Sequence, residues 1–113
     1  MITPYILYAS MIVLSAICNA AMDRTGDVVA FNKSIFQHRN QKFWCKEISW
    51  LYARKIFGWK LDAWHIFKSS MIICWALAAI FFKSTGYFIV DLLLIGTIWN
   101  LFFNLFYNKL FKQ

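Results

Sequence analysis

The sequence predicts an all-α integral membrane protein with three transmembrane helices and a cytoplasmic interfacial loop that is partly helical. The first observation is composition: of 113 residues, 61% are hydrophobic, 20% aromatic and only 15% charged. Soluble domains carry about 25% charged residues, and disordered chains are poor in aromatic ones. The second observation is that the apolar residues fall into three long runs, interrupted by one long basic segment. We therefore expect a single membrane domain over residues 1–113.

The three apolar runs are residues 5–22, 64–82 and 86–107. A helix of about 17–25 apolar residues crosses the hydrocarbon core of a bilayer, so each run is long enough. The first run carries no charge, the second has Lys68 near its start, and the third contains Asp91. Only Lys83, Ser84 and Thr85 separate the second and third runs, which predicts that these two helices are antiparallel neighbours in a hairpin.

The first run could alternatively be a cleaved signal peptide. Signal peptides begin with a positively charged region, and the residues before this run, Met-Ile-Thr-Pro, carry no side-chain charge. We therefore expect the run to be retained as a helix. The cysteines, at positions 18, 45 and 74, are far apart in the sequence and predict neither a disulfide framework nor a thiolate metal site.

The loop over residues 23–63 determines the expected orientation. It holds eight of the twelve basic residues: Arg24, Lys33, Arg39, Lys42, Lys46, Arg54, Lys55 and Lys60. With three spans, the C-terminus lies on the same side as this loop, where Lys109 and Lys112 add to the positive charge. The positive-inside rule then predicts an inner (cytoplasmic) membrane protein with its N-terminus outside and its C-terminus inside.

The same loop is unusually aromatic for a connection between helices. Its rings are Phe31, Phe36, Phe43, Trp44, Trp50, Tyr52, Phe57 and Trp59. Aromatic rings interleaved with Lys and Arg are typical of segments that lie in the membrane interface, so we expect anionic membrane lipids as partners. The best helical stretch, residues 46–57, either contacts lipid or packs on the protein's own helices. Single-stranded nucleic-acid surfaces share this composition, but three spans argue against a nucleic-acid partner.

Polar residues inside the apolar runs need partners, because hydrocarbon offers none. Thr97, Asn100, Asn104 and Asn108 share one face of the third run, where we expect them to make hydrogen bonds to another helix. Asp91 is expected to pair with Lys83, with an ion or proton pathway as the alternative.

A cluster of ionisable residues is expected at the inner ends of the first two runs. Asp62 and His65 are three apart and share a helical face, and Asp23 directly follows the first run. Carboxylates and imidazole suit a divalent metal, so Asp23, Asp62 and His65, with His38 from the loop, are candidate metal ligands. His65, Asp62 and Lys68 are the candidate catalytic residues, with His65 as base and Lys68 holding an anion. Helix capping or pairing with nearby cations is the alternative.

Two motifs carry a resemblance. Asn19-x-x-x-Asp23 covers the inner end of the first run and the residue after it, and Asp62-Ala63-Trp64-His65-Ile66-Phe67-Lys68 covers the start of the second run and the two residues before it. The chain resembles small uncharacterised membrane proteins of bacterial and phage genomes that pair these motifs. The resemblance implies a shared fold and no known activity.

The function expected from these features is interaction, through the basic, aromatic loop, with anionic lipid or a partner membrane protein. Self-association into a homo-oligomer is also compatible with the sequence. The alternative is a minimal metal-dependent or acid/base enzyme acting on a lipid headgroup or phosphate at the cytoplasmic face. A holin-type pore is a further alternative.

Overall fold

The computed structural model describes residues 3–52, 54–56 and 59–112 and is dominated by three long helices. These are α1 (Thr3–Thr25), α5 (Ala63–Phe81) and α6 (Phe88–Leu105), which the π-helical turn η1 (Phe106–Leu110) continues. All three are long and apolar enough to cross a membrane. The prediction of three candidate membrane-spanning helices is confirmed.

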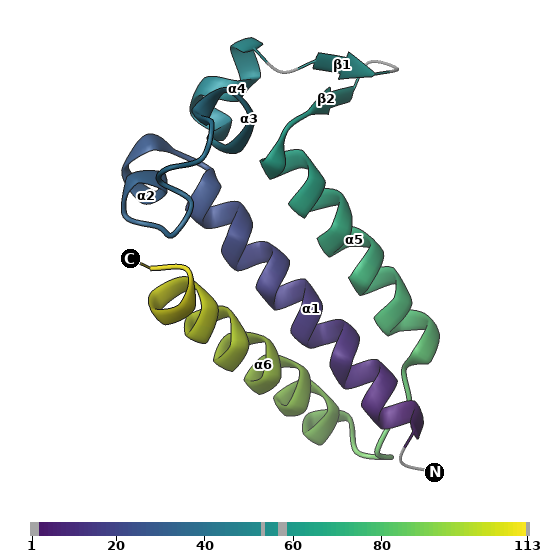
Figure 1. The fold of residues 1–113 in the computed structure, drawn as a ribbon. Helices are drawn as coiled ribbons and strands as arrows, with labels where there is room; N and C mark the ends of the chain where they lie inside the picture. The colour runs from purple at the N-terminus through teal and green to yellow at the C-terminus, as the bar shows by residue number, and fades with distance from the viewer. Residues whose placement is uncertain (1–2, 53, 57–58, 113) are drawn as a thin grey trace.

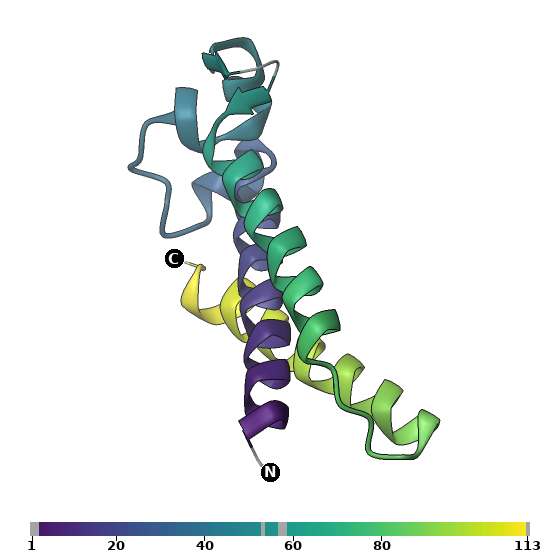
Figure 2. The same ribbon diagram turned by 90° about the vertical axis from the view of Figure 1, so that its right-hand side faces the viewer.

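The central helix of the bundle is α1, with α5 on one side and α6 on the other (Figure 1). Contact between α5 and α6 is marginal at most, and α6 tilts away from α5 after the short connection (Figure 2). The predicted hairpin of neighbouring helices is therefore wrong. The reason lies in α1, whose buried face includes Ser15, Ala16, Ala20 and Ala21. Small residues allow helices to approach closely, so α1 takes the position between the other two.

The apolar core at the N-terminal end of α1 is small. Tyr8, Ile12 and Ala78 are buried together, and Ile98 and Trp99 of α6 pack against them. The side chains of Met11 and Ile95 complete this cluster. Most large apolar residues of α5 and α6 are instead exposed on the outside of the bundle, which is where a bilayer would meet them.

The described residues between 26 and 62 lie together at one end of the bundle (Figure 1), and we call this part of the chain the cap. It contains α2 (Val28–Asn32), α3 (Gln41–Trp44), α4 (Lys46–Tyr52) and an antiparallel pair of three-residue strands, β1 (Arg54–Ile56) and β2 (Trp59–Leu61). The loop is partly helical, as predicted. The helix expected over residues 46–57 ends at Tyr52, because the chain then turns into the strand pair; Phe57 lies outside the described residues.

The C-terminal segment joins the cap to the bundle. The backbone N–H of Ile35 donates to the carbonyl of Phe111 at 2.8 Å, and the ring of Phe36 lies 5.3 Å from that of Phe111. Arg24, which is buried, donates from Nε and Nη2 to the carbonyl of Tyr107 at 3.0 and 2.6 Å. The end of α1, the cap and the C-terminus therefore meet at one end of the molecule (Figure 1).

At the other end, the connection between α5 and α6 is organised by Asp91. Its carboxylate accepts hydrogen bonds from Ser84 Oγ at 2.6 Å, and from the backbone N–H and Oγ1 of Thr85 at 2.9 and 2.8 Å. Lys83 points elsewhere, with Nζ 5.8 Å from the centre of the Tyr5 ring. The expected Lys83–Asp91 pair is therefore wrong, because the turn itself supplies the donors.

Candidate functional site

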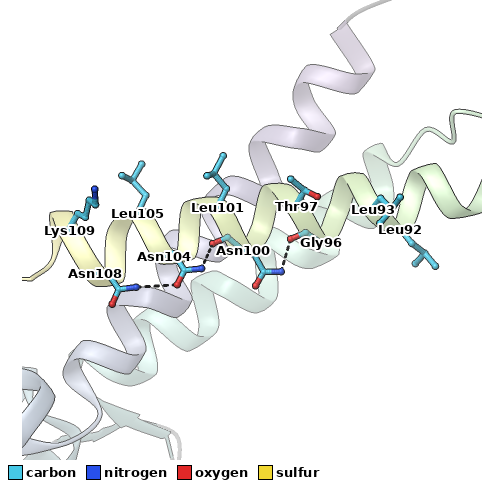
Figure 3. Close-up of a pocket in the computed structure, with 10 residues that line it drawn as sticks. All are labelled: Leu92, Leu93, Gly96, Thr97, Asn100, Leu101, Asn104, Leu105, Asn108 and Lys109. Carbon is cyan, nitrogen blue, oxygen red and sulfur yellow. Dashed lines mark hydrogen bonds between the residues drawn. The ribbon is translucent and has the colours of Figure 1, made fainter.

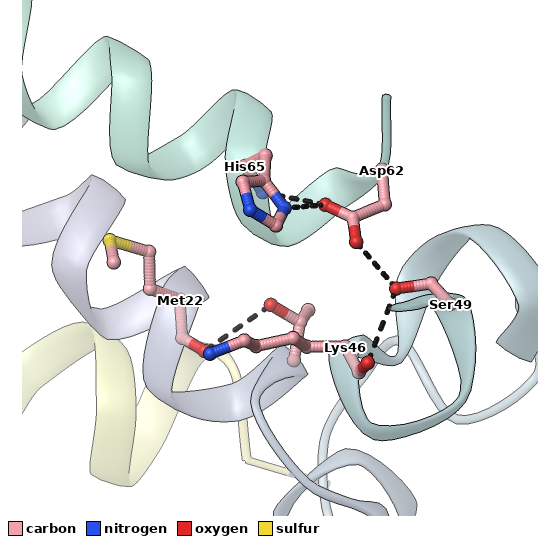
Figure 4. Close-up of polar contacts among 6 residues, drawn as sticks. Met22, Lys46, Ser49, Asp62 and His65 are labelled. Atoms are coloured by element: carbon pink, nitrogen blue, oxygen red, sulfur yellow. Dashed lines mark hydrogen bonds and ion pairs between the residues drawn. The ribbon is translucent and has the colours of Figure 1, made fainter. Parts of the chain in front are cut away.

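The candidate site lies where the cap meets the start of α5, and Asp62 is its centre (Figure 4). Asp62 immediately precedes α5 with an extended backbone, and its Oδ1 accepts a hydrogen bond from the backbone N–H of His65 at 2.8 Å. Asp is among the most favourable residues for this N-cap position. The side chain is fully buried, so its remaining hydrogen-bonding capacity must be satisfied by the protein.

The side chains of His65 and Ser49 satisfy the remaining hydrogen-bonding capacity of Asp62. Asp62 Oδ1 is 2.7 Å from Nδ1 of His65, and Ser49 Oγ, from α4, donates to Asp62 Oδ2 at 2.5 Å. Ser49 is also fully buried. Both carboxylate oxygens therefore have partners, and the Ser49 contact fixes α4 of the cap to the first turn of α5.

The imidazole of His65 is oriented by this arrangement. Its Nδ1 faces Asp62, which leaves Nε2 as the nitrogen that could take a proton or bind a ligand. The side chain is 37% exposed, so Nε2 is accessible from outside the cluster. Ser49 bonds to the carboxylate rather than to the imidazole, and it therefore lacks the adjacent base that a serine nucleophile needs. The geometry is that of an Asp–His pair with a structural serine.

Two lysines lie close to the neighbouring indole. Nζ of Lys46 is 3.8 Å and Nζ of Lys68 is 5.2 Å from the centre of the Trp64 ring, and Trp64 packs edge-on against His65 with ring centres 4.9 Å apart. A cation over an aromatic face is attracted by the ring's quadrupole. Lys68, predicted to hold an anion, is exposed and lies on Trp64, beside the Asp–His pair.

The predicted metal ligands are only partly brought together. Asp62 and His65 are in contact, whereas Asp23 and His38 are exposed on α1 and the cap. Among residues 3–52, 54–56 and 59–112, no group of three or more His, Cys, Asp or Glu side chains could hold a metal ion. This geometry therefore does not bring all four predicted ligands to a single divalent ion.

The asparagine stripe, which we define as Asn100, Asn104 and Asn108, does not make the expected hydrogen bonds to another helix. Asn100 Nδ2 donates to the carbonyl of Gly96 at 2.8 Å, Asn104 Nδ2 to that of Asn100 at 2.9 Å, and Asn108 Nδ2 to Asn104 Oδ1 at 3.1 Å (Figure 3). These bonds lie within α6 and η1, not between helices. The three amides are exposed, because α1 packs against the opposite face of α6.

Sequence reasoning did not include Ser49 or Lys46 in the site. Both belong to α4, and Ser49 lies 13 residues before Asp62, so their approach depends on how the cap folds. A serine between Ile48 and Trp50 was the available signal, since a polar residue among apolar ones is often buried against a partner.

Comparisons with protein-family models, curated proteins and solved structures find no match to this chain.

Proposed function

We propose that this protein spans the inner (cytoplasmic) membrane three times, with its N-terminus outside and its C-terminus inside, and that its cap binds anionic phospholipid headgroups. Three helices that are long and apolar enough to span support the first part. The distribution of positive charge supports the orientation, because the cap and C-terminal end carry nearly all the Lys and Arg outside the spans, whereas the opposite end has Lys83. The cytoplasmic leaflet is the anionic one in this arrangement.

The pairing of cations with aromatic rings at the cap end carries the proposal. Arg39 lies 5.9 Å from the centre of the Trp44 ring, and Lys46 and Lys68 lie on Trp64. Rings of this kind sit at the boundary between acyl chains and headgroups, while Lys and Arg reach the phosphates. Arg39 and Lys68 are exposed here, and Lys46, Trp44 and Trp64 are half-buried. A surface that places both groups side by side is therefore suited to phosphatidylglycerol or cardiolipin rather than to a neutral lipid.

The test uses the full chain reconstituted into vesicles. Quenching of tryptophan fluorescence by brominated phosphatidylglycerol is compared with quenching by brominated phosphatidylcholine at equal mole fraction. We expect preferential quenching by the anionic lipid, and an Arg39→Gln, Lys46→Gln variant should lose about fivefold or more of that preference, since each basic residue near an anionic surface contributes about 1 kcal/mol. Lys83→Gln, at the other end, is the matched control. Equal quenching by both lipids, or an equal loss in the control, would contradict the proposal.

The orientation has a separate test. Fusions of alkaline phosphatase, active only outside, and of green fluorescent protein, fluorescent only inside, are compared at the C-terminus. A fluorescent and phosphatase-negative C-terminus is expected. The reverse result would show that the cap faces outward and would remove the lipid-charge argument.

A second candidate function is acid/base chemistry at His65, and the buried Asp62 that orients its Nδ1 is the observation that favours it. In phosphodiester hydrolysis, Nε2 would take a proton from water while the water oxygen bonds to phosphorus, and the same proton would then pass to the departing headgroup alcohol. Mass spectrometry of phosphatidylglycerol vesicles tests this by detecting released glycerol. His65→Gln should abolish release and His38→Gln should not; no release above the His65→Gln level would refute the activity.

A further inference from the structure

A shallow groove runs along the outer face of α6 and η1 (Figure 3). Its walls come from one helical segment alone, with Leu93, Leu101 and Leu105 beside the amides of Asn100, Asn104 and Asn108. The leucines are exposed, and this face points away from α1. A polar stripe thus lies on the outside of a helix that is apolar enough to span a membrane.

Acyl chains cannot satisfy these amides. Each asparagine side chain offers two N–H donors and one carbonyl acceptor, and the bonds within the helix use one donor of each. Among the described residues, no second element covers the stripe. An exposed amide in hydrocarbon is costly, so the occupant of this groove must itself bring donors and acceptors.

Gly96 supplies an independent observation. It lies one helical turn before Asn100 on the same face, and a Cβ built there would meet nothing within 4 Å. Packing within a single chain therefore does not require a glycine at this position. At helix interfaces in membranes, glycine lets two backbones approach closely, and asparagine side chains make hydrogen bonds from one helix to the other.

We propose that α6 forms a parallel homodimer through this stripe, so that the occupant of the groove is α6 of a second copy of the chain. This inference rests on the membrane insertion proposed above, which gives all copies one orientation. A two-fold axis along the membrane normal then places each residue of the seam opposite its own counterpart. An amide is self-complementary, since one copy donates N–H to the carbonyl of the other and accepts in return. The lining contains no acidic residue and its one charge, Lys109, is at the end, so no oppositely charged partner is indicated.

The spacing of the stripe also predicts the geometry of the pair. Positions 96, 100, 104 and 108 are four apart and drift slowly around the helix, which favours right-handed packing at a crossing angle of about −40°. Two α6 helices crossing in this way would bring Gly96 and Asn100 to the closest approach and would let η1 diverge, which separates the two Lys109 side chains.

The experiment measures dimerisation of the full chain in vesicles by single-molecule photobleaching over a range of protein-to-lipid ratios. We expect the unaltered chain to show two-step bleaching that increases with protein density. Asn100→Leu combined with Asn104→Leu, and separately Gly96→Leu, should weaken the dimer by about tenfold or more. Ala79→Leu, on the exposed face of α5, is the matched control and should leave dimerisation unchanged.

A second measurement identifies the face. In a background with all three native cysteines replaced, Thr97→Cys should cross-link to its counterpart under mild oxidation, whereas Ile73→Cys on α5 should not. Monomers at every density, a dimer that all three groove substitutions leave unaltered, or stronger cross-linking at position 73 would each overturn the proposal.

Discussion

Replacing Asp62 should be among the most damaging single changes outside the apolar core. The side chain is fully buried, caps α5 through the N–H of His65, and accepts hydrogen bonds from Ser49 and His65. Loss of an N-cap costs about 1 kcal/mol, and a hydrogen bond to a charged group contributes about 1.5–3 kcal/mol. Because these contributions share one side chain and are not additive, we expect Asp62→Ala to lower the free energy of unfolding by about 3–5 kcal/mol.

Asp62→Asn separates capping from the contact with His65. The amide oxygen can still accept from the N–H of His65, and the amide nitrogen can donate to the Ser49 hydroxyl, so the cap and the contact with α4 are kept. The charge-assisted bond to the imidazole is lost. We therefore expect a smaller loss than for Asp62→Ala, about 1–2 kcal/mol.

Unfolding by sodium dodecyl sulfate in mixed micelles, followed by helical circular dichroism, measures these differences. Asp23→Ala is the control, since Asp23 is exposed and its loss should change the free energy of unfolding by no more than about 0.5 kcal/mol. If Asp62→Ala is as stable as the control, the buried cluster does not hold the cap on α5, and the argument from its hydrogen bonds fails.

The remaining predictions concern three other groups. Arg24→Met removes two hydrogen bonds to Tyr107 and a cation placed 4.0 Å from the centre of that ring, so unfolding should become easier by about 2–4 kcal/mol; Arg39→Met, on the surface, is the control. Tyr8 has a buried hydroxyl without a partner among the described residues, and Tyr8→Phe should therefore raise stability, by about 1 kcal/mol; a loss of stability in the same detergent titration would show that the hydroxyl is bonded. Burial raises the pKa of the Cys45 thiol, so the unfolded chain releases the thiol proton at lower pH than the folded chain does. The free energy of unfolding should therefore fall from pH 8 to 10 more steeply than in Cys45→Ala. Parallel pH profiles for the two proteins would show that the Cys45 thiol does not contribute to the pH dependence.

The three long helices could be predicted because span length and apolarity are local properties of the sequence. Their arrangement could not. A short connection between α5 and α6 indicated a hairpin, but helices associate through complementary faces, and the small residues of α1 offer α5 a closer approach than α6 does. Choosing between these pairs requires comparing side-chain shapes on all three helices, which periodicity alone does not encode.

The candidate site was predictable to the extent that it lies within one helical turn. Asp62 and His65 are three apart, and that spacing alone places them on one face. Ser49 and Lys46 come from α4, whose position depends on where the helix ends and the strand pair begins. Asp23 and His38 were grouped with Asp62 and His65 because all four were expected at a similar depth in the membrane. Depth does not determine which way a side chain points around a helix axis.

Among the side chains whose burial the structure describes, the charged ones that are buried are Arg24 and Asp62. They lie at the same end of the bundle, and each satisfies the end of a different helix. Asp62 accepts from an N–H in the first turn of α5, and Arg24 donates to a carbonyl in the last turn before the C-terminus. Helix ends leave such groups unpaired, and opposite charges are favourable at opposite ends of a helix. On the cap side of Arg24 and Asp62, the cap supplies polar partners. Between these two residues and the turn around Asp91, α5 and α6 expose mostly apolar side chains. The level of Arg24 and Asp62 is therefore where we expect the cytoplasmic boundary of the hydrocarbon core. Asn108 would lie at this boundary, within reach of headgroups and water, whereas Asn100 and Asn104 would lie about one to two helical turns deeper, where another helix is the partner that can satisfy their amides.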